Sequence, residues 1–210
     1  MTGMGNPTTW SLGVQDTVIA ALERAVSAYP DRILLDFAGD TYTYAEVDRL
    51  STAMAHSLAS LGVKSGHPVV SMLDNNIDAI VTWLAVNKLC AVSVPINTAL
   101  RGKFLEHQIS DAAAHVVICE ANYFGRIGAV SAQLCDLKLI LHRDELSEKP
   151  DLNIEYAPLD AHRGSNISPI ENKPKPSDLA CIIYTSGTTG PSKGCMLSYN
   201  FMCSLARQQL

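Results

Sequence analysis

The sequence offers little that would hold a metal ion. It has six cysteines, but no two of them form a C-x-x-C pair, and no histidine lies at ligand spacing from a cysteine. The six histidines are isolated from one another as well, so we expect no metal site. We expect buried or incidental thiols, as in a reducing compartment. These cysteines are Cys90, Cys119, Cys135, Cys181, Cys195 and Cys203.

Targeting, membrane and nucleic-acid signals are absent too. Residues 1–13 have neither the basic start nor the apolar stretch of a signal peptide. The longest apolar stretch, Ala79 to Pro95, is interrupted by Asn87 and Lys88 and is too short and too polar to span a bilayer. The formal net charge is -5, and the charges are scattered rather than gathered in a basic stripe. We expect a soluble cytoplasmic protein that has no transmembrane segment and binds no nucleic acid.

What the sequence does contain is an alternation of strand and helix patterns. With 210 residues, 47% hydrophobic and 18% charged, it suits one domain or a large piece of one. Strands are predicted near 33–37, 41–43, 68–73, 91–95, 115–119, 137–141, 179–184 and 194–198. Helices are predicted near 16–29, 44–61, 77–89, 102–110, 121–135 and from 199 onward. Such alternation predicts an α/β fold, with a mainly parallel sheet flanked by helices on both faces.

Local signals mark some boundaries. Thr43 and Glu46 form the capping-box pattern Thr-x-x-Glu ahead of a helix, and Gly62 is placed to end that helix. Between residues 143 and 177 five prolines fall among polar and charged residues. That composition predicts a connecting segment that is irregular or folded across the surface.

A loop rich in hydroxyl groups follows the apolar residues 179–183. Residues 184–194 read YTSGTTGPSKG. Gly187 and Gly190 allow several backbone N–H groups to turn toward one anion, and Lys193 adds a positive charge. Hydroxyl donors come from Thr185, Ser186, Thr188 and Thr189. A flexible surface linker is the alternative, but the strand, the hydroxyls and the lysine coincide in a phosphate-binding order.

Two common phosphate motifs do not fit. In the Walker pattern G-x-x-x-x-G-K-[ST], Lys193 has the right spacing from Gly187, but Ser192 stands at the second glycine and Gly194 at the magnesium-binding hydroxyl. The Rossmann pattern fails because residues 3–5 lack a third glycine and a preceding strand.

Residues 184–194 instead resemble the phosphate-loop signature of the adenylate-forming enzymes, a superfamily that includes acyl-CoA synthetases, peptide-synthetase adenylation domains and beetle luciferases. Cys195 departs mildly, because a small aliphatic residue is more usual there. The resemblance extends to residues 41–66 and 69–100. Residues 95–98, Pro-Ile-Asn-Thr, are similar to the acyl-CoA ligase branch, with fatty-acyl and crotonobetaine/carnitine-type ligases nearest.

The resemblance implies two half-reactions. A carboxylic acid substrate attacks the α-phosphate of ATP to give an acyl-adenylate and pyrophosphate, and coenzyme A or a carrier thiol then takes the acyl group. ATP, Mg²⁺ and coenzyme A are therefore the implied cofactors, and no side chain in this stretch needs to be a nucleophile. The implied phosphate-binding residues are Thr185, Ser186, Gly187, Thr188, Thr189, Gly190 and Lys193.

Several parts of the family pattern have no place in this sequence. A Thr-Glu motif, an Asp for the ribose hydroxyls and a late catalytic Lys on a C-terminal domain all lie further along in relatives. We expect residues 1–210 to be an incomplete N-terminal domain that does not complete adenylation alone. Apolar surface left exposed would then permit a non-native dimer. The alternative is a noncatalytic nucleotide-binding or interaction module with the same fold.

Other polar residues are ambiguous. Asn97 and Arg101 are candidates to approach the nucleotide or coenzyme A, but we favour a turn cap for Asn97 and a solvated charge for Arg101. His107 and His115 are expected to be structural rather than catalytic.

Overall fold

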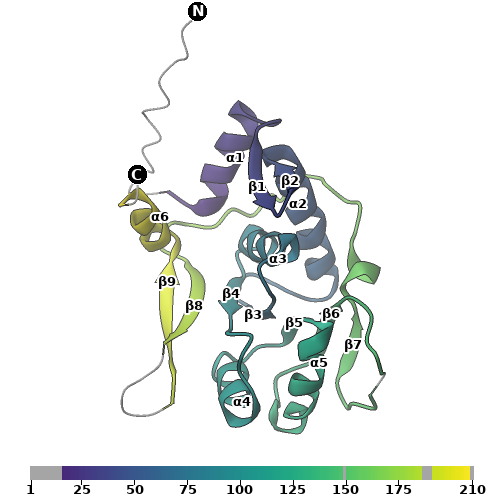
Figure 1. The fold of residues 1–210 in the computed structure, drawn as a ribbon. Coiled ribbons are helices and arrows are strands. Elements are labelled where there is room, and N and C mark those ends of the chain that lie inside the picture. The colour runs from purple at the N-terminus through teal and green to yellow at the C-terminus, as the bar shows by residue number, and fades with distance from the viewer. Residues whose placement is uncertain (1–15, 149, 186–190, 209–210) are drawn as a thin grey trace, which may run out of the picture.

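A computed structural model describes residues 16–148, 150–185 and 191–208 of the chain. The α-helices are α1 (Val18–Ala28), α2 (Tyr44–Ser60), α3 (Ile77–Lys88), α4 (Gly102–Asp111), α5 (Ala121–Gly128) and α6 (Tyr199–Arg207). The strands are β1 (Ile33–Phe37), β2 (Asp40–Thr43), β3 (Pro68–Met72), β4 (Val92–Pro95), β5 (Val116–Glu120), β6 (Leu139–Arg143), β7 (Glu155–Pro158), β8 (Leu179–Thr185) and β9 (Lys193–Ser198). Figure 1 shows their arrangement.

Seven strands form one sheet in the order β7-β6-β5-β3-β4-β8-β9. The first six are parallel, and only β9 runs antiparallel, against β8. The register pairs Val69 with Val116 at the centre and Ser93 with Cys181 where β8 joins. The predicted α/β fold with a mainly parallel sheet is therefore confirmed.

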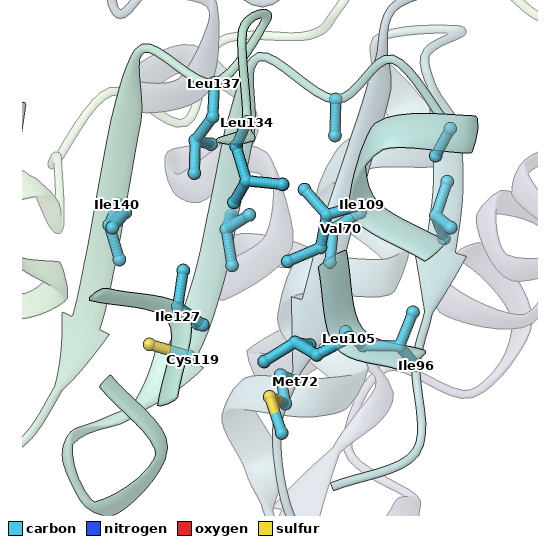
Figure 2. Close-up of a cluster of buried hydrophobic side chains, with 14 of the residues drawn as sticks. Val70, Met72, Ile96, Leu105, Ile109, Cys119, Ile127, Leu134, Leu137 and Ile140 are labelled. Carbon is cyan, nitrogen blue, oxygen red and sulfur yellow. The ribbon is translucent and has the colours of Figure 1, made fainter. Parts of the chain in front are cut away.

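Helices cover both faces of this sheet. Val70, Val117 and Ile140 point to the face that α4 and α5 cover, whereas their neighbours along the strands pack toward α2 and α3. This alternation follows from the two-residue period of a strand. Figure 2 shows the first face, where Leu105 and Ile109 of α4 lie over the sheet. The helices on either face leave the strand ends, rather than the strand faces, to carry polar chemistry.

The local boundary signals acted as expected. The Thr43 hydroxyl accepts a hydrogen bond from the Glu46 N–H at 3.2 Å, and a Glu46 carboxylate oxygen accepts one from the Thr43 N–H at 2.8 Å. Gly62 follows the end of α2 with φ +90°, a left-handed conformation that favours glycine. Asn76 caps α3 by accepting from the Ala79 N–H at 3.2 Å.

Two segments differ from the prediction. The helix expected over residues 121–135 ends at Gly128, and only a short 3-10 helix, η1 (Ser131–Gln133), follows. The proline-rich segment 143–177 also contains structure of its own, because β7 adds a parallel strand at the sheet edge and the 3-10 helix η2 (Leu159–His162) follows it.

The rest of this segment is tied to the helices that it crosses. After η2 it runs past α2 to the opposite side of the molecule, where β8 begins (Figure 1). Arg163 donates to the buried Asp78 carboxylate of α3 at 2.8 and 2.9 Å. His56 of α2 makes a hydrogen bond from Nε2 to the Ser168 carbonyl at 2.8 Å. The segment therefore connects η2 to the β8–β9 hairpin and is attached to α2 and α3 by hydrogen bonds.

Candidate phosphate-binding loop

The predicted phosphate loop joins two paired strands. Thr185 ends β8, Lys193 begins β9, and the two residues are register partners. Because β8 is parallel to its sheet neighbour β4, the loop leaves the carboxyl edge of the parallel sheet, the edge where α/β folds place ligands. Ser186, Gly187, Thr188, Thr189 and Gly190 lie outside the described residues.

The two described site residues face solvent. Both Thr185 and Lys193 are exposed. The Lys193 ammonium makes no ion pair with any residue in the described part of the chain, whereas the buried Lys88 is paired with Asp48 at 2.7 Å. A lysine without such a pair is available to an anion. The placement of these two residues therefore suits a phosphate-bearing ligand.

The residue after Lys193 lies close to two side chains of β8. A Cβ atom on Gly194 would lie 2.7 Å from the Ile182 side chain and 3.4 Å from the Tyr184 ring. The first distance is shorter than real Cβ contacts allow, so a side chain at residue 194 would displace the Ile182 side chain. Gly194 thus leaves room for the Ile182 and Tyr184 side chains in the hairpin.

Helix α4 contacts the hairpin on both sides of the loop. The Tyr184 hydroxyl donates to an Asp111 carboxylate oxygen at 2.7 Å, and His107 Nε2 lies 2.8 Å from the Ser192 carbonyl oxygen. Gln108 Nε2 donates to the Ser192 hydroxyl at 3.0 Å. Burial and the Asp111 carboxylate both raise the pKa of Tyr184, so the phenol stays protonated and remains a donor. Residues on both sides of the loop are therefore hydrogen-bonded to α4.

The sequence alone does not reveal this set of contacts. The expectation that His107 is structural agrees with its contact to a backbone carbonyl, but no pattern places it near the loop. Gln108 and Asp111 carry no motif. They lie 84 and 73 residues from their partners, and nothing in the local pattern links positions so far apart.

The remaining candidates lie elsewhere. The Asn97 side-chain oxygen accepts from the Ala99 N–H at 2.8 Å, which is the turn-cap role, and Arg101 is exposed. His115 stacks on His67 with ring centroids 5.7 Å apart. The six cysteines are free thiols. Within the described ranges, no three His, Cys, Asp or Glu side chains gather as metal ligands. None of the helices described there is both long and apolar enough to cross a bilayer.

A family model described as AMP-binding enzyme matches residues 22–210. The chain therefore belongs to the AMP-binding enzymes, the adenylate-forming superfamily.

Two curated relatives come from different branches of this superfamily. A linear gramicidin synthase of Brevibacillus parabrevis is 30% identical over 201 residues, a match that covers 96% of this chain and 2% of that protein. The 4-coumarate-CoA ligase 1 of Narcissus pseudonarcissus is 26% identical over 174 residues, covering 83% of this chain and 31% of the relative. The chain thus spans less than a third of the length of either relative.

Solved structures share the fold. An anthranilate CoA ligase, AuaEII, solved in complex with anthranoyl-AMP, superposes with a TM-score of 0.80 at 23% identity, covering 90% of this chain and 36% of that one. A putative long-chain-fatty-acid CoA ligase from Rhodopseudomonas palustris gives a TM-score of 0.75 at 22% identity, with 88% and 45% covered. At these identities the likeness establishes the architecture alone.

Proposed function

We propose that the chain is the N-terminal part of an ATP-dependent acid–CoA ligase, which activates a carboxylic acid as an acyl-adenylate and passes the acyl group to coenzyme A. The observation that carries this proposal is the pairing of Thr185 with Lys193, which places both ends of the signature loop at the carboxyl ends of the parallel strands. Membership of the AMP-binding enzymes and the resemblance of residues 95–98 to acyl-CoA ligases support it.

In this proposal the loop binds the phosphates that leave as pyrophosphate. As the substrate carboxylate attacks the α-phosphorus, the bond to the bridging oxygen breaks and negative charge grows on the departing group. The Lys193 ammonium and the hydroxyls of Thr185, Ser186, Thr188 and Thr189 would stabilise that charge. Gly187 and Gly190 would let backbone N–H groups face the same anion. Bound Mg²⁺ would neutralise further phosphate charge.

A second acceptor for the acyl group has support of its own. The match to the linear gramicidin synthase, at 30% identity, exceeds the 26% to 4-coumarate-CoA ligase 1. In the second candidate function, the activated acid passes to the thiol of a carrier protein. The two candidates share the adenylation step and differ only in the thiol, so offering both thiols to the complete protein and measuring thioester formation separates them.

The adenylation step is tested by pyrophosphate exchange into ATP, measured on the complete protein with a panel of aliphatic, aromatic and amino acids. Losing one charge-assisted contact costs about 1.5–3 kcal/mol, so Lys193→Ala should lower exchange roughly tenfold to hundredfold. Lys64→Ala is the matched control, because Lys64 is also exposed but precedes β3, at the opposite edge of the sheet. Equal exchange by both variants would remove Lys193 from the site.

We further propose that residues 1–210 are an incomplete N-terminal domain whose C-terminal partner is needed for turnover. The coverage of 31% to 45% of single-ligase relatives and neighbours supports this view. The isolated chain should then bind pyrophosphate but release none from ATP in the presence of acid. Acid-dependent pyrophosphate release by the isolated chain would favour a self-sufficient enzyme instead.

A further inference from the structure

We propose that α4 positions the phosphate loop, by fixing its two ends to one rigid helix through His107, Gln108 and Asp111. These side chains would act as positioning residues, since they contact the hairpin rather than the ligand. The inference rests on the proposed phosphate-binding role of residues 185–193.

The contacts bracket the loop at matching places. On the β8 side, Asp111 accepts from Tyr184, the residue immediately before Thr185, at 2.7 Å. On the β9 side, His107 and Gln108 hold Ser192, the residue immediately before Lys193, at 2.8 and 3.0 Å. Since a carbonyl oxygen only accepts, His107 must carry its proton on Nε2 in this contact. The residues that immediately precede Thr185 and Lys193 are therefore both hydrogen-bonded to the same ten-residue helix.

The helix itself is rigid enough to act as a reference. Leu105 and Ile109 are buried in the main core, beside the contacting residues in the sequence (Figure 2). Gln108 is only 7% exposed, so its hydrogen bond to Ser192 starts from a buried side chain. His107 also meets the Tyr184 ring edge-on, with centroids 6.4 Å apart. Movements of the loop ends would have to break contacts with a packed element.

Lys193 needs such an anchor more than most lysines. Its side chain has no carboxylate partner among the described residues to orient it, so its backbone decides where the ammonium can reach. Binding a phosphate with unanchored loop ends would also require fixing the backbone around Thr185 and Lys193, which costs conformational entropy. Anchoring both ends in advance reduces that cost, and the reduction should appear as tighter binding of ATP.

The test uses the complete protein and steady-state adenylation with MgATP varied. A typical hydrogen bond contributes about 1 kcal/mol, so His107→Ala should raise the KM for MgATP roughly fivefold with a smaller change in kcat. His107→Gln keeps an N–H donor and should restore KM to within about twofold. Glu106→Ala, a neighbouring change on α4 with no hydrogen bond to the described hairpin, should leave KM unchanged. Unfolding temperatures are measured for every variant.

Ser192→Ala and Gln108→Ala both probe the hydrogen bond between Gln108 and Ser192. Ser192→Ala does so without loss of a core side chain. The two changes should be non-additive, because each removes the same hydrogen bond. Additive effects, or a His107→Ala protein with wild-type KM, would overturn the positioning role. The positioning role would also be overturned if the rise in KM of His107→Ala is not reversed in His107→Gln and parallels a fall in the unfolding temperature.

Lys193→Ala separates this inference from the proposed function. If Lys193→Ala raises the KM for MgATP while His107→Ala does not, the loop binds phosphate and α4 does not position it. If Lys193→Ala leaves MgATP kinetics unchanged, the proposed phosphate site is wrong and the positioning role is overturned with it. Elevated KM in both variants, with rescue by His107→Gln, supports both.

Discussion

Replacing Asp78 with Asn should weaken the attachment to α3 of the connecting segment that precedes β8. Asp78 lies in the first turn of α3 with its side chain 3% exposed. Its carboxylate accepts from Arg163 at 2.8 and 2.9 Å and from Arg143 Nε at 2.8 Å. Asparagine keeps the size, but it removes the charge and turns an N–H group toward a guanidinium.

The expected cost follows from the burial of each partner. Removing one member of a buried ion pair costs about 3–5 kcal/mol. The arginine side chains are 31% and 37% exposed, so water will screen part of the unpaired charge. We therefore expect a loss of about 2–3 kcal/mol in the free energy of unfolding. Urea unfolding of the isolated chain, followed by far-UV circular dichroism, measures this loss.

Asp160→Asn provides a matched control, because Asp160 also pairs with Arg163 but its side chain is 72% exposed. Exposed pairs contribute about 0–1 kcal/mol, so this variant should stay close to wild type. Equal, small losses in the two variants would refute the reasoning that burial makes the Asp78 network stabilising.

The pH dependence gives the same reasoning a second test. Burial alone would raise the pKa of Asp78, but hydrogen bonds and charge from Arg163 and then Arg143 outweigh it, and the pKa falls below its ordinary 3.8. A depressed carboxyl pKa contributes stability that is present above the unfolded value and lost as pH falls through the folded one. The stability gap between wild type and Asp78→Asn should be constant near neutral pH and should shrink below pH 3.8. A gap that stays constant down to about pH 2 would contradict this linkage.

Two further changes test local features. Thr43→Ala removes the capping box of α2 and should lower the free energy of unfolding in urea by about 1 kcal/mol. Thr41→Ala, at an exposed position of β2, should lower it less. Equal losses in the two variants would argue against the cap. Phe201 and Leu205 are 47% and 45% exposed one turn apart on α6, so changing both to Ser should raise the monomer fraction of the isolated chain in sedimentation velocity. Phe104→Ser, at an exposed site on α4, should have no such effect, and similar monomer fractions for all would exclude α6 as a contact surface.

Strand and helix positions were predictable where a local pattern decides them. The Thr43 and Glu46 pair and the position of Gly62 place both ends of α2 without reference to the rest of the fold. Prediction failed for β7, whose four residues include a proline and contain only two partly buried side chains. That strand forms because the edge of β6 is available to pair with it, which no local signal records. The early end of α5 has a local reason. Gly125 and Gly128 weaken this helix, and β6 follows it closely in the chain.

For the candidate site, the motif identified the loop, whereas the sheet topology explains why α4 reaches it. Strand β4 pairs with β8 through Ser93 and Cys181, and α4 is the helix that follows β4. This one pairing therefore brings α4 close to Tyr184 and Ser192, which lie far from it in the chain. A slip of one residue in the register would turn Tyr184 to the other face of the sheet, away from Asp111. The geometry of the loop ends thus depends on packing along β4, and buried residues such as Val94 belong to the structural support of the proposed site.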